Sequence, residues 1–391
     1  MKKRVAIVFE EDIFNQKGTF HAKLERARHL MSRPELEVEV FCIQVRYTWI
    51  ERLILGSRWL SGVSERRLGR PGKLDFDGVN YRMLWMPYSI LDHFLFFKRG
   101  RRPLFYPRFL KRQAALLKDF DWISAHGFEG GFLALEARRR YGIPYTVSWH
   151  GSDIHTKPFK YPCIREETAS LIAHARMNYF VSKALLEASE KIGPGAKRVL
   201  YNGVDAAFFR FPDRQRELLR RSEGVEQLRV VAFIGNLFPV KQAELLPEIF
   251  REMQEPDIRF WVIGDGPLRA RIEAGAGDTV RFWGDVPHSR MPEILNMTDL
   301  VILPSRNEGF GMVLAEALCC GCKAVGSRVG GIPEIIGEEA CVPLGDDFVS
   351  RFAQQAKSAL EGPENLFFVR DRFDWVFIAQ EEMLFILQNT K

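Results

Sequence analysis

The chain has 391 residues, a length that exceeds what a single hydrophobic core usually covers. Its net charge of +6 hides an asymmetry, because the first 200 residues carry 35 Lys and Arg against 21 Asp and Glu, whereas residues 201–391 carry 21 against 29. The sequence has no run of about 18 apolar residues, which argues against a membrane-spanning helix. The six cysteines follow no disulfide framework and indicate reduced thiols in the cytoplasm. We therefore expect two domains, of which the basic first domain suits an anionic partner.

Short apolar strands alternate with helical stretches in both halves of the chain. In the first half the expected strands are Val5–Phe9, Val38–Val45, Trp122–Ala125, Tyr145–Trp149, Asn178–Val181 and Arg198–Tyr201. In the second half they are Val230–Ile234, Ile258–Ile263, Val280–Trp283, Leu300–Leu303 and Ala324–Gly326. Strands separated by helices predict an α/β fold with two Rossmann-like, doubly wound domains of parallel strands.

The domain boundaries follow from breaks in this alternation. Residues 1–205 form the predicted N-terminal domain, and residues 206–370 form the predicted C-terminal domain. The apolar spacing in Phe373–Leu387 is typical of an amphipathic helix. We expect this last segment, 371–391, to pack back on the N-terminal domain.

Two segments have a form that a metal site could use. Asp75 and Asp77 are spaced like an Asp-x-Asp metal clamp, but Gly78 and the alternation after it favour the turn of a hairpin. The cysteines in 319–322 have no second Cys/His cluster to complete a zinc site. We therefore predict no metal and no cofactor.

Glu308 and Glu316 are the most informative pair in the chain. The first follows the strand Leu300–Leu303 in a Gly-rich loop, and the second lies in a helical pattern that begins near Gly311. Eight residues at helical rise span at most about 12 Å, roughly the reach from a hexose across a diphosphate to a ribose. Carboxylates accept hydrogen bonds from sugar hydroxyls. The alternative is that both acids only favour the positive end of a helix dipole.

Other groups in the second half suit the same ligand. The loop 309–311 can present backbone N–H groups at a helix N-terminus, where anions bind. Lys241 follows the strand Val230–Ile234 and could neutralise a diphosphate, or be an ordinary solvated charge. The turn that begins at Gly264 resembles half of a dinucleotide fingerprint, but its third Gly is missing, which favours a tight strand-to-helix turn.

Two histidines end strands of the first half. His150 and Asp153 follow the strand Tyr145–Trp149, and His126 follows Trp122–Ala125. A His at a strand end is often structural. Because each is followed by Gly in the wall of an expected cleft, we also consider a ligand role, more strongly for His150 than for His126.

These motifs together resemble family 4 of the retaining glycosyltransferases, which have the GT-B fold of two Rossmann-like domains facing across a cleft. The resemblance covers nearly the whole chain. The matching segments are 18–19, 150–153, 181–182, 201–205, 241, 264–267, 308–316 and 330–334.

The resemblance implies a nucleoside diphosphate sugar as the donor, bound mainly by the C-terminal domain, with the N-terminal domain on the acceptor side. It also gives each matching residue a role. Glu308 and the amides of Phe310 and Gly311 would hold sugar hydroxyls, Glu316 the ribose, and Lys241 the diphosphate. Gly18 would leave room beside the phosphates, and His150 would touch the donor sugar. The expected catalytic residues are Lys241, Glu308 and His150. The expected donor-binding residues are Gly18, Asn236, Gly264, Phe310, Gly311, Met312 and Glu316.

Three positions depart from the family pattern. Asn236 stands where the family usually has Arg, which would leave Lys241 as the main diphosphate cation. Lys323 stands where Pro is usual, and Thr19 where a second Gly is usual. Either of these last two could alter donor preference.

A basic, aromatic stretch marks the acceptor side. Phe94–Arg112 carries seven positive charges among large apolar side chains, and Tyr47–Leu60 adds two Trp residues. This composition suits the headgroup region of an anionic membrane, although a core helix flanked by solvated Arg would look similar. Nucleic acid is not expected, because no recognition motif accompanies the charge. The candidate acceptor or membrane residues are Asp153, His126, Arg99, Arg101, Arg102, Trp49 and Trp59.

The sequence thus predicts a metal-independent retaining glycosyltransferase, peripheral on the inner face of the membrane, that uses a lipid-linked or cell-surface glycan acceptor. One alternative is a soluble enzyme that glycosylates a small molecule. Another is a GT-B protein that epimerises or only binds a sugar nucleotide. The donor base and sugar, the linkage and the oligomeric state are not predicted.

Overall fold

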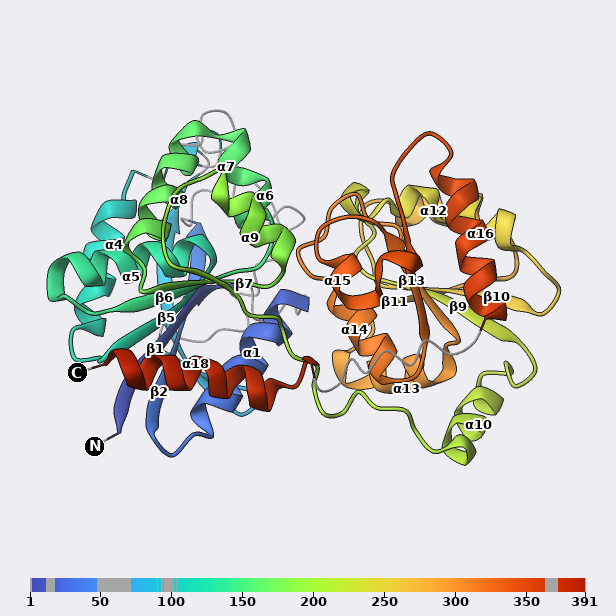
Figure 1. Cartoon of the computed structure of the whole chain (residues 1–391), viewed down its shortest axis with the longest axis horizontal. Helices are drawn as coiled ribbons and strands as arrows, with labels where there is room; N and C mark the ends of the chain where they lie inside the picture. Colours follow the sequence, from blue (N-terminus) through green and yellow to red (C-terminus); the bar gives the residue numbers. More distant parts are fainter. Residues whose placement is uncertain are drawn as a thin grey trace. The chain divides into compact units, whose positions relative to one another are not determined.

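The computed structural model describes residues 2–11, 18–47, 72–89, 91–92, 94, 102, 104–362 and 372–390. The chain folds into two compact units (Figure 1). Unit 1 comprises the residues up to Tyr201 together with those from Trp375 on, and unit 2 comprises Asn202–Asp374.

Unit 1 is built on a mixed eight-stranded sheet with the order β3-β4-β2-β1-β5-β6-β7-β8. All neighbouring pairs are parallel except β3 and β4. The central strand β1 has an apolar run, Val5–Phe9, that is fully buried, as expected for a strand covered on both faces. The strands are β1 (Lys3–Glu10), β2 (Leu36–Tyr47), β3 (Lys73–Phe76), β4 (Val79–Tyr88), β5 (Trp122–His126), β6 (Tyr145–Trp149), β7 (Met177–Phe180) and β8 (Lys197–Val199).

The hairpin predicted at Asp75–Asp77 is confirmed. Asp75 lies in β3 and pairs with Asn80 of β4, and the turn between the strands holds Asp77 and Gly78 at φ of 52° and 74°. Two consecutive positive φ angles are the mark of the tight turn that matches strand twist. Asp75 and Asp77 therefore serve the hairpin.

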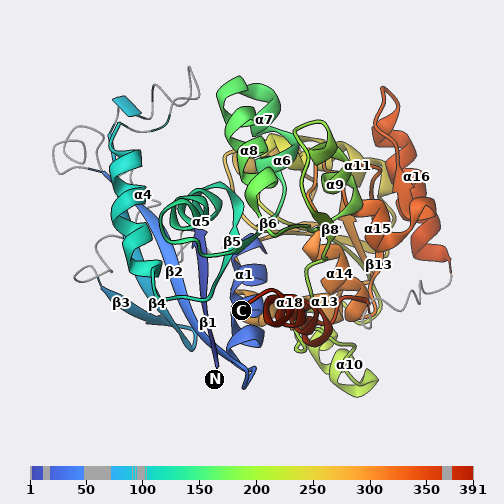
Figure 2. The same ribbon diagram turned by 60° about the vertical axis from the view of Figure 1, so that its left-hand side comes forward.

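Helices connect the strands of unit 1 along the chain and cover both faces of its sheet (Figure 2). Ser182 caps α9, since its side chain accepts a hydrogen bond from the Leu185 N–H at 3.3 Å. The helices are α1 (Gly18–Met31), α4 (Tyr106–Ala114), α5 (Gly127–Tyr141), α6 (Ser152–His155), α7 (Lys157–Lys160), α8 (Pro162–His174), α9 (Lys183–Glu190) and α18 (Trp375–Asn389).

The last helix, α18, belongs to unit 1 although 173 residues of unit 2 precede it in the chain. It lies alongside α1 (Figures 1 and 2). Its buried side chains Ala379, Met383 and Ile386 join the same hydrophobic core as β1 and α1.

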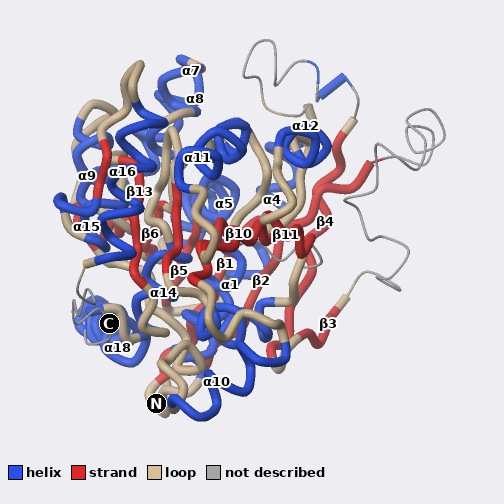
Figure 3. The backbone as a smooth tube through the Cα atoms, turned by 90° about the vertical axis from the view of Figure 1, so that its right-hand side faces the viewer, coloured by secondary structure: helices blue, strands red, loops and turns tan. Residues whose placement is uncertain are grey.

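Unit 2 is built on a six-stranded parallel sheet with the order β11-β10-β9-β12-β13-β14. Its strands are β9 (Arg229–Ile234), β10 (Ile258–Ile263), β11 (Val280–Gly284), β12 (Leu300–Leu303), β13 (Lys323–Ser327) and β14 (Cys341–Val342). Its α-helices are α10 (Asp213–Ser222), α11 (Leu246–Met253), α12 (Arg269–Gly275), α13 (Met291–Met297), α14 (Met312–Cys319), α15 (Ile332–Ile336) and α16 (Phe348–Glu361). Figure 3 shows the strands in red between helices in blue. The predicted α/β fold with two doubly wound units is confirmed.

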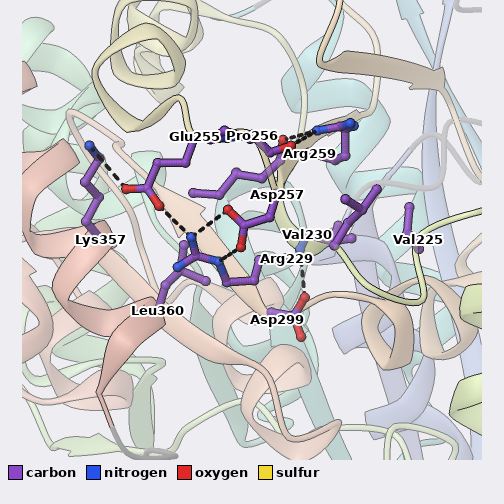
Figure 4. A network of polar contacts seen from close by, with 12 residues as sticks. Val225, Arg229, Val230, Glu255, Pro256, Asp257, Arg259, Asp299, Lys357 and Leu360 are labelled. Carbon is purple, nitrogen blue, oxygen red and sulfur yellow. Dashed lines mark hydrogen bonds and ion pairs between the residues drawn. The ribbon is translucent and has the colours of Figure 1, made fainter.

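Polar contacts fix the amino ends of the strands of unit 2 (Figure 4). Arg229, the first residue of β9, binds Asp257 at 2.7 Å and Glu255 at 2.5 Å, just before β10 begins. Asp299, just before β12, accepts a hydrogen bond from the Val230 N–H at 2.7 Å. These contacts lie at the end of the sheet opposite the loops that follow the strands, where ligands bind in open parallel sheets.

Candidate functional site

The two charged residues that the sequence singled out in unit 2 form an ion pair. Lys241 follows β9, Glu308 follows β12, and these strands are neighbours in the sheet. The backbone joins the two loops, because the Arg306 N–H donates to the Val240 carbonyl at 2.9 Å. Lys241 Nζ binds Glu308 Oε2, and the two side chains are 23% and 16% exposed. The fold thus brings a cation and a carboxylate together at the carboxyl end of the sheet.

The turn after β13 packs against the backbone of Glu308. The Gly331 N–H donates to the Glu308 carbonyl at 3.2 Å. Gly330 has φ of +52°, and a Cβ placed on it would lie 1.7 Å from the Glu308 carbonyl oxygen. Only glycine fits this close approach, so the 330–331 turn holds the Glu308 loop in position.

The loops after β9 and β10 are locked together in a similar way. Gly264 has φ of +118°, and a Cβ on it would lie 2.2 Å from the Gly235 carbonyl oxygen. The Leu237 N–H donates to the Asp265 carbonyl at 3.0 Å. The half-buried Asn236 therefore stands in a loop whose backbone is fixed, and Gly264 makes a tight turn as the sequence predicted.

Helix α14 begins directly at the Gly-rich loop. Gly311, at φ of +102°, is the N-cap, and Met312 is the first helical residue. Phe310 is buried, and its ring contacts Phe373 edge-on at 5.3 Å. The backbone of 310–312 therefore forms the positive end of the α14 dipole, which favours an anion or a hydroxyl oxygen.

Glu316 lies inside α14 and is only 8% exposed. His288 Nε2 lies 3.1 Å from Glu316 Oε1, and the His288 ring contacts Phe208 at 5.0 Å. Sequence reasoning missed His288, because a single His in the loop after β11 has no pattern around it. A hydrogen bond from imidazole fixes the carboxylate orientation without filling its second oxygen.

In unit 1 the two candidate histidines touch each other. His126 ends β5 and His150 follows β6, and these strands are neighbours. A hydrogen bond joins His126 Nδ1 and His150 Nε2 at 3.0 Å, and the rings stack at 5.3 Å. Burial lowers the pKa of both histidines well below the usual value, with smaller effects from His150 on His126 and from Lys23 and Arg26 on both, so both rings are neutral near pH 7.

One ring nitrogen of each histidine makes no hydrogen bond within the described residues. His126 Nε2 and His150 Nδ1 are buried and have no hydrogen-bond partner within the described part of the chain. Asp153 fixes the backbone beside them, because its carboxylate accepts from the His150 N–H at 3.2 Å and from the Gly151 N–H at 2.7 Å. Gly18 lies at the first position of α1.

The structure describes only some of the predicted acceptor or membrane residues. Trp49, Trp59, Arg99 and Arg101 lie outside the described residues. Arg102 is 13% exposed and binds Glu129 at 2.7 Å and Glu167 at 3.0 Å. Its guanidinium also stacks on the Phe132 ring at 4.3 Å. This geometry favours a packing role for Arg102 over a surface charge.

An exposed surface with apolar and basic residues stands next to Arg102. Leu104 is 82% exposed and Phe105 is 56% exposed, directly before α4. The same helix exposes Arg108, Lys111 and Arg112. We call these five residues the α4 surface.

Lys323, a departure from the family pattern, lies at the amino end of β13. Its Nζ donates to the carbonyls of Leu360 at 2.9 Å and Gly362 at 2.5 Å, at the end of α16. Lys323 therefore caps a helix at the end of the sheet opposite Lys241 and Glu308, which argues against the suggested effect on donor preference.

The described residues contain no group of three or more His, Cys, Asp or Glu side chains arranged to hold a metal ion. They also contain no helix that is both long and apolar enough to cross a membrane.

The fold of two doubly wound units defines the GT-B class, and comparison with solved structures agrees with this class. Anabaena HepE in complex with UDP and glucose superposes with a TM-score of 0.72 at 16% identity, over 99% of this chain and 100% of that chain. Sucrose-phosphate synthase from Thermosynechococcus elongatus superposes with a TM-score of 0.74 at 16% identity, over 99% of both chains.

Sequence comparison gives the family. Residues 70–208 match the profile of Glycosyltransferase Family 4, and residues 228–362 match that of Glycosyl transferases group 1. The chain belongs to the group 1 glycosyltransferases of family 4.

Curated relatives match over part of their length. D-inositol 3-phosphate glycosyltransferase of Segniliparus rotundus is 30% identical over 42% of this chain and 39% of its own. N-acetyl-alpha-D-glucosaminyl L-malate synthase of Bacillus anthracis is 28% identical over 50% of this chain and 52% of its own. The chain thus spans less than two thirds of the length of these relatives.

Proposed function

We propose that the protein transfers a sugar from a nucleoside diphosphate sugar to a lipid-linked or cell-surface glycan acceptor, with retention of anomeric configuration and without a metal ion. The observation that carries the proposal is the Lys241–Glu308 pair, held beside the N-terminus of α14 by three interlocked loops. Family membership and the relatives' names support transfer from a sugar nucleotide, and the structural neighbour HepE binds UDP and glucose.

The proposed chemistry concerns the leaving group. Negative charge grows on the diphosphate as the glycosidic bond breaks, so groups that bind this charge stabilise the transition state more than the ground state. Lys241 and the N–H groups that begin α14 supply such stabilisation. Because Lys241 is already paired with Glu308, the cation is oriented before the donor binds.

The remaining donor contacts use carboxylates and backbone. Glu308 and the amides of Phe310 and Gly311 would bind sugar hydroxyls. Glu316 would bind the ribose hydroxyls with the oxygen that His288 leaves open. No side chain in this set is a nucleophile or a general acid.

Unit 1 would contribute the acceptor side. We assign His150, whose ring is only partly buried, the contact with the donor sugar. His126 orients the ring of His150, and Asp153 fixes its backbone. Gly18 would leave space beside the phosphates.

The α4 surface suits an anionic membrane. Exposed Leu104 and Phe105 would enter the acyl boundary, while Arg108, Lys111 and Arg112 would contact the headgroups. This surface supports a peripheral location on the cytoplasmic face of the membrane and a lipid-linked acceptor.

Nucleotide release from a panel of UDP-, GDP- and ADP-sugars, with lipid extracts as acceptors, tests the transfer reaction. Lys241→Met and Glu308→Gln should each lower turnover by about 100-fold or more. The control is Lys357→Met, which removes a Lys paired with Glu255 at the opposite end of the sheet. Unchanged turnover in both site variants would refute the site, and release without any acceptor would favour a sugar-nucleotide binder or epimerase.

Vesicle sedimentation separates a lipid-linked acceptor from a small soluble one. We expect salt-sensitive binding to anionic vesicles, weakened by Leu104→Ser with Phe105→Ser. The matched control is Phe377→Ser with Leu384→Ser, which changes exposed apolar residues of α18. Absence of vesicle binding would favour the small-molecule alternative.

A further inference from the structure

A buried ion pair joins the last helix of the chain to the first. Arg26 of α1 is 1% exposed and Glu382 of α18 is fully buried, and Arg26 Nε lies 2.5 Å from Glu382 Oε2. Burying two charges is unfavourable unless further hydrogen bonds satisfy them. The contacts that supply those hydrogen bonds lead toward the histidine pair.

Two serines extend the network. The Ser124 hydroxyl donates to Glu382 Oε1 at 2.6 Å, and Arg26 Nη1 donates to the Ser148 hydroxyl at 2.9 Å. Both serines are buried. Ser124 precedes His126 by two residues, and Ser148 precedes His150 by two residues.

The geometry of the sheet places Ser124, His126 and Ser148 on one face, and His150, the first residue after β6, stacks on His126. Side chains two residues apart in a strand point to the same side. His126 of β5 is the register partner of Ser148 of β6, and Ser124 is the partner of Thr146. A polar column therefore runs from α18 through the ion pair and the two serines to His126 and His150, inside an otherwise apolar core.

We propose that Glu382 is a positioning residue that, together with Arg26, sets the orientation of His126 and His150 by holding Ser124 in the middle of β5 and Ser148 near the end of β6. The ion pair does not touch the histidines, so it acts through the backbone of β5 and β6. This inference rests on the proposed function only for its effect on turnover, because the geometry of the histidine pair can be measured without substrate.

The network can be removed without leaving an unpaired charge. Arg26→Met with Glu382→Leu replaces the ion pair by apolar side chains of similar size, a change that often leaves stability intact. The matched control is Arg198→Met with Glu381→Leu, which removes a more exposed ion pair that joins β8 to the same helix α18, with a 3.0 Å separation. A second test variant, Ser124→Ala with Ser148→Ala, keeps the ion pair but cuts its link to the strands.

Three measurements decide the proposal: urea unfolding, the imidazole ¹⁵N signals of His126 and His150, and kcat with the KM for the donor. We expect the test variants to fold cooperatively, to shift the imidazole signals, and to lower kcat about tenfold or more at unchanged KM for the donor. The control should change none of these.

Unshifted imidazole signals and unchanged kcat in a folded test variant would overturn the proposal. If the Arg26/Glu382 variant does not fold, the serine variant decides alone by the same criteria. If the wild-type protein transfers no sugar, the proposed function fails, and the imidazole signals still decide whether the network positions the histidines.

Discussion

Gly330→Ala is the sharpest test of how the loops form the donor site. The substitution adds a single methyl group in the turn after β13. In the structure this methyl carbon would lie 1.7 Å from the Glu308 carbonyl oxygen, whereas ordinary van der Waals contact begins near 3.4 Å. The two loops must therefore separate by about 1.7 Å, the difference between these distances, which would break the hydrogen bond from Gly331 to Glu308.

Two effects add up in this variant. The positive φ of Gly330 costs an alanine about 1–2 kcal/mol. The displaced loop carries Glu308, and a shift of about 1 Å at a catalytic group can reduce turnover about 100-fold. We therefore expect a loss of stability beyond the strain alone and a loss of turnover of about 100-fold.

Matched glycines in unit 2 separate these effects. Gly224 has φ of +68° with open space around it, so Gly224→Ala has the strain without the contact. Gly277 has neither a positive φ nor a close neighbour, and the free energy of unfolding of Gly277→Ala should stay within about 0.5 kcal/mol of that of the wild type. Urea unfolding and donor turnover are measured for all three variants. The reasoning is refuted if Gly330→Ala is as stable as Gly224→Ala and retains wild-type turnover.

Three further predictions concern pH and stability. The pKa values of His126 and His150 are lowered in the fold, so the unfolded chain takes up protons first, and the free energy of unfolding should fall as pH drops below about 6.5. A flat urea midpoint from pH 8 to 5 would contradict this. Lys323→Ala should lower the free energy of unfolding, measured with urea, by about 1 kcal/mol and leave nucleotide affinity unchanged, because only a helix end is affected. Weaker nucleotide binding would count against this capping role. Arg102→Met should lower the free energy of unfolding by about 3 kcal/mol, since Glu129 is left largely buried without its cation, and vesicle sedimentation should not change. If Arg102 were a surface charge, the variant would instead keep its stability and bind vesicles more weakly.

The sequence predicts most of the strands because their cores are continuous apolar runs. Ile258–Ile263 and Leu300–Leu303 match β10 and β12 residue for residue. It does not predict β14, since two residues are too short to show a period. The position of β4 between β3 and β2 is also missed, because the order of strands depends on contacts between distant segments.

For the site, the sequence locates loops better than contacts. Lys241 and Glu308 follow strands, so the rule that ligands bind beyond the carboxyl ends of strands points to both. Their direct ion pair depends on β9 and β12 being neighbours, which no local pattern reveals. His288 stays hidden for the same reason, because its partner Glu316 is 28 residues away in the chain, in helix α14.

The position of α18 has a consequence for folding. Arg26 and Glu382 are 356 residues apart in the chain. During synthesis all of unit 2 is made before Glu382, so Arg26 has no carboxylate partner while the strands of unit 1 already exist. A buried cation without its partner is strongly unfavourable. Unit 1 should therefore reach its native packing only after α18 docks, although domains generally fold in the order of their synthesis. The same late contact then orders β5, which ends at His126, and β6, which His150 directly follows.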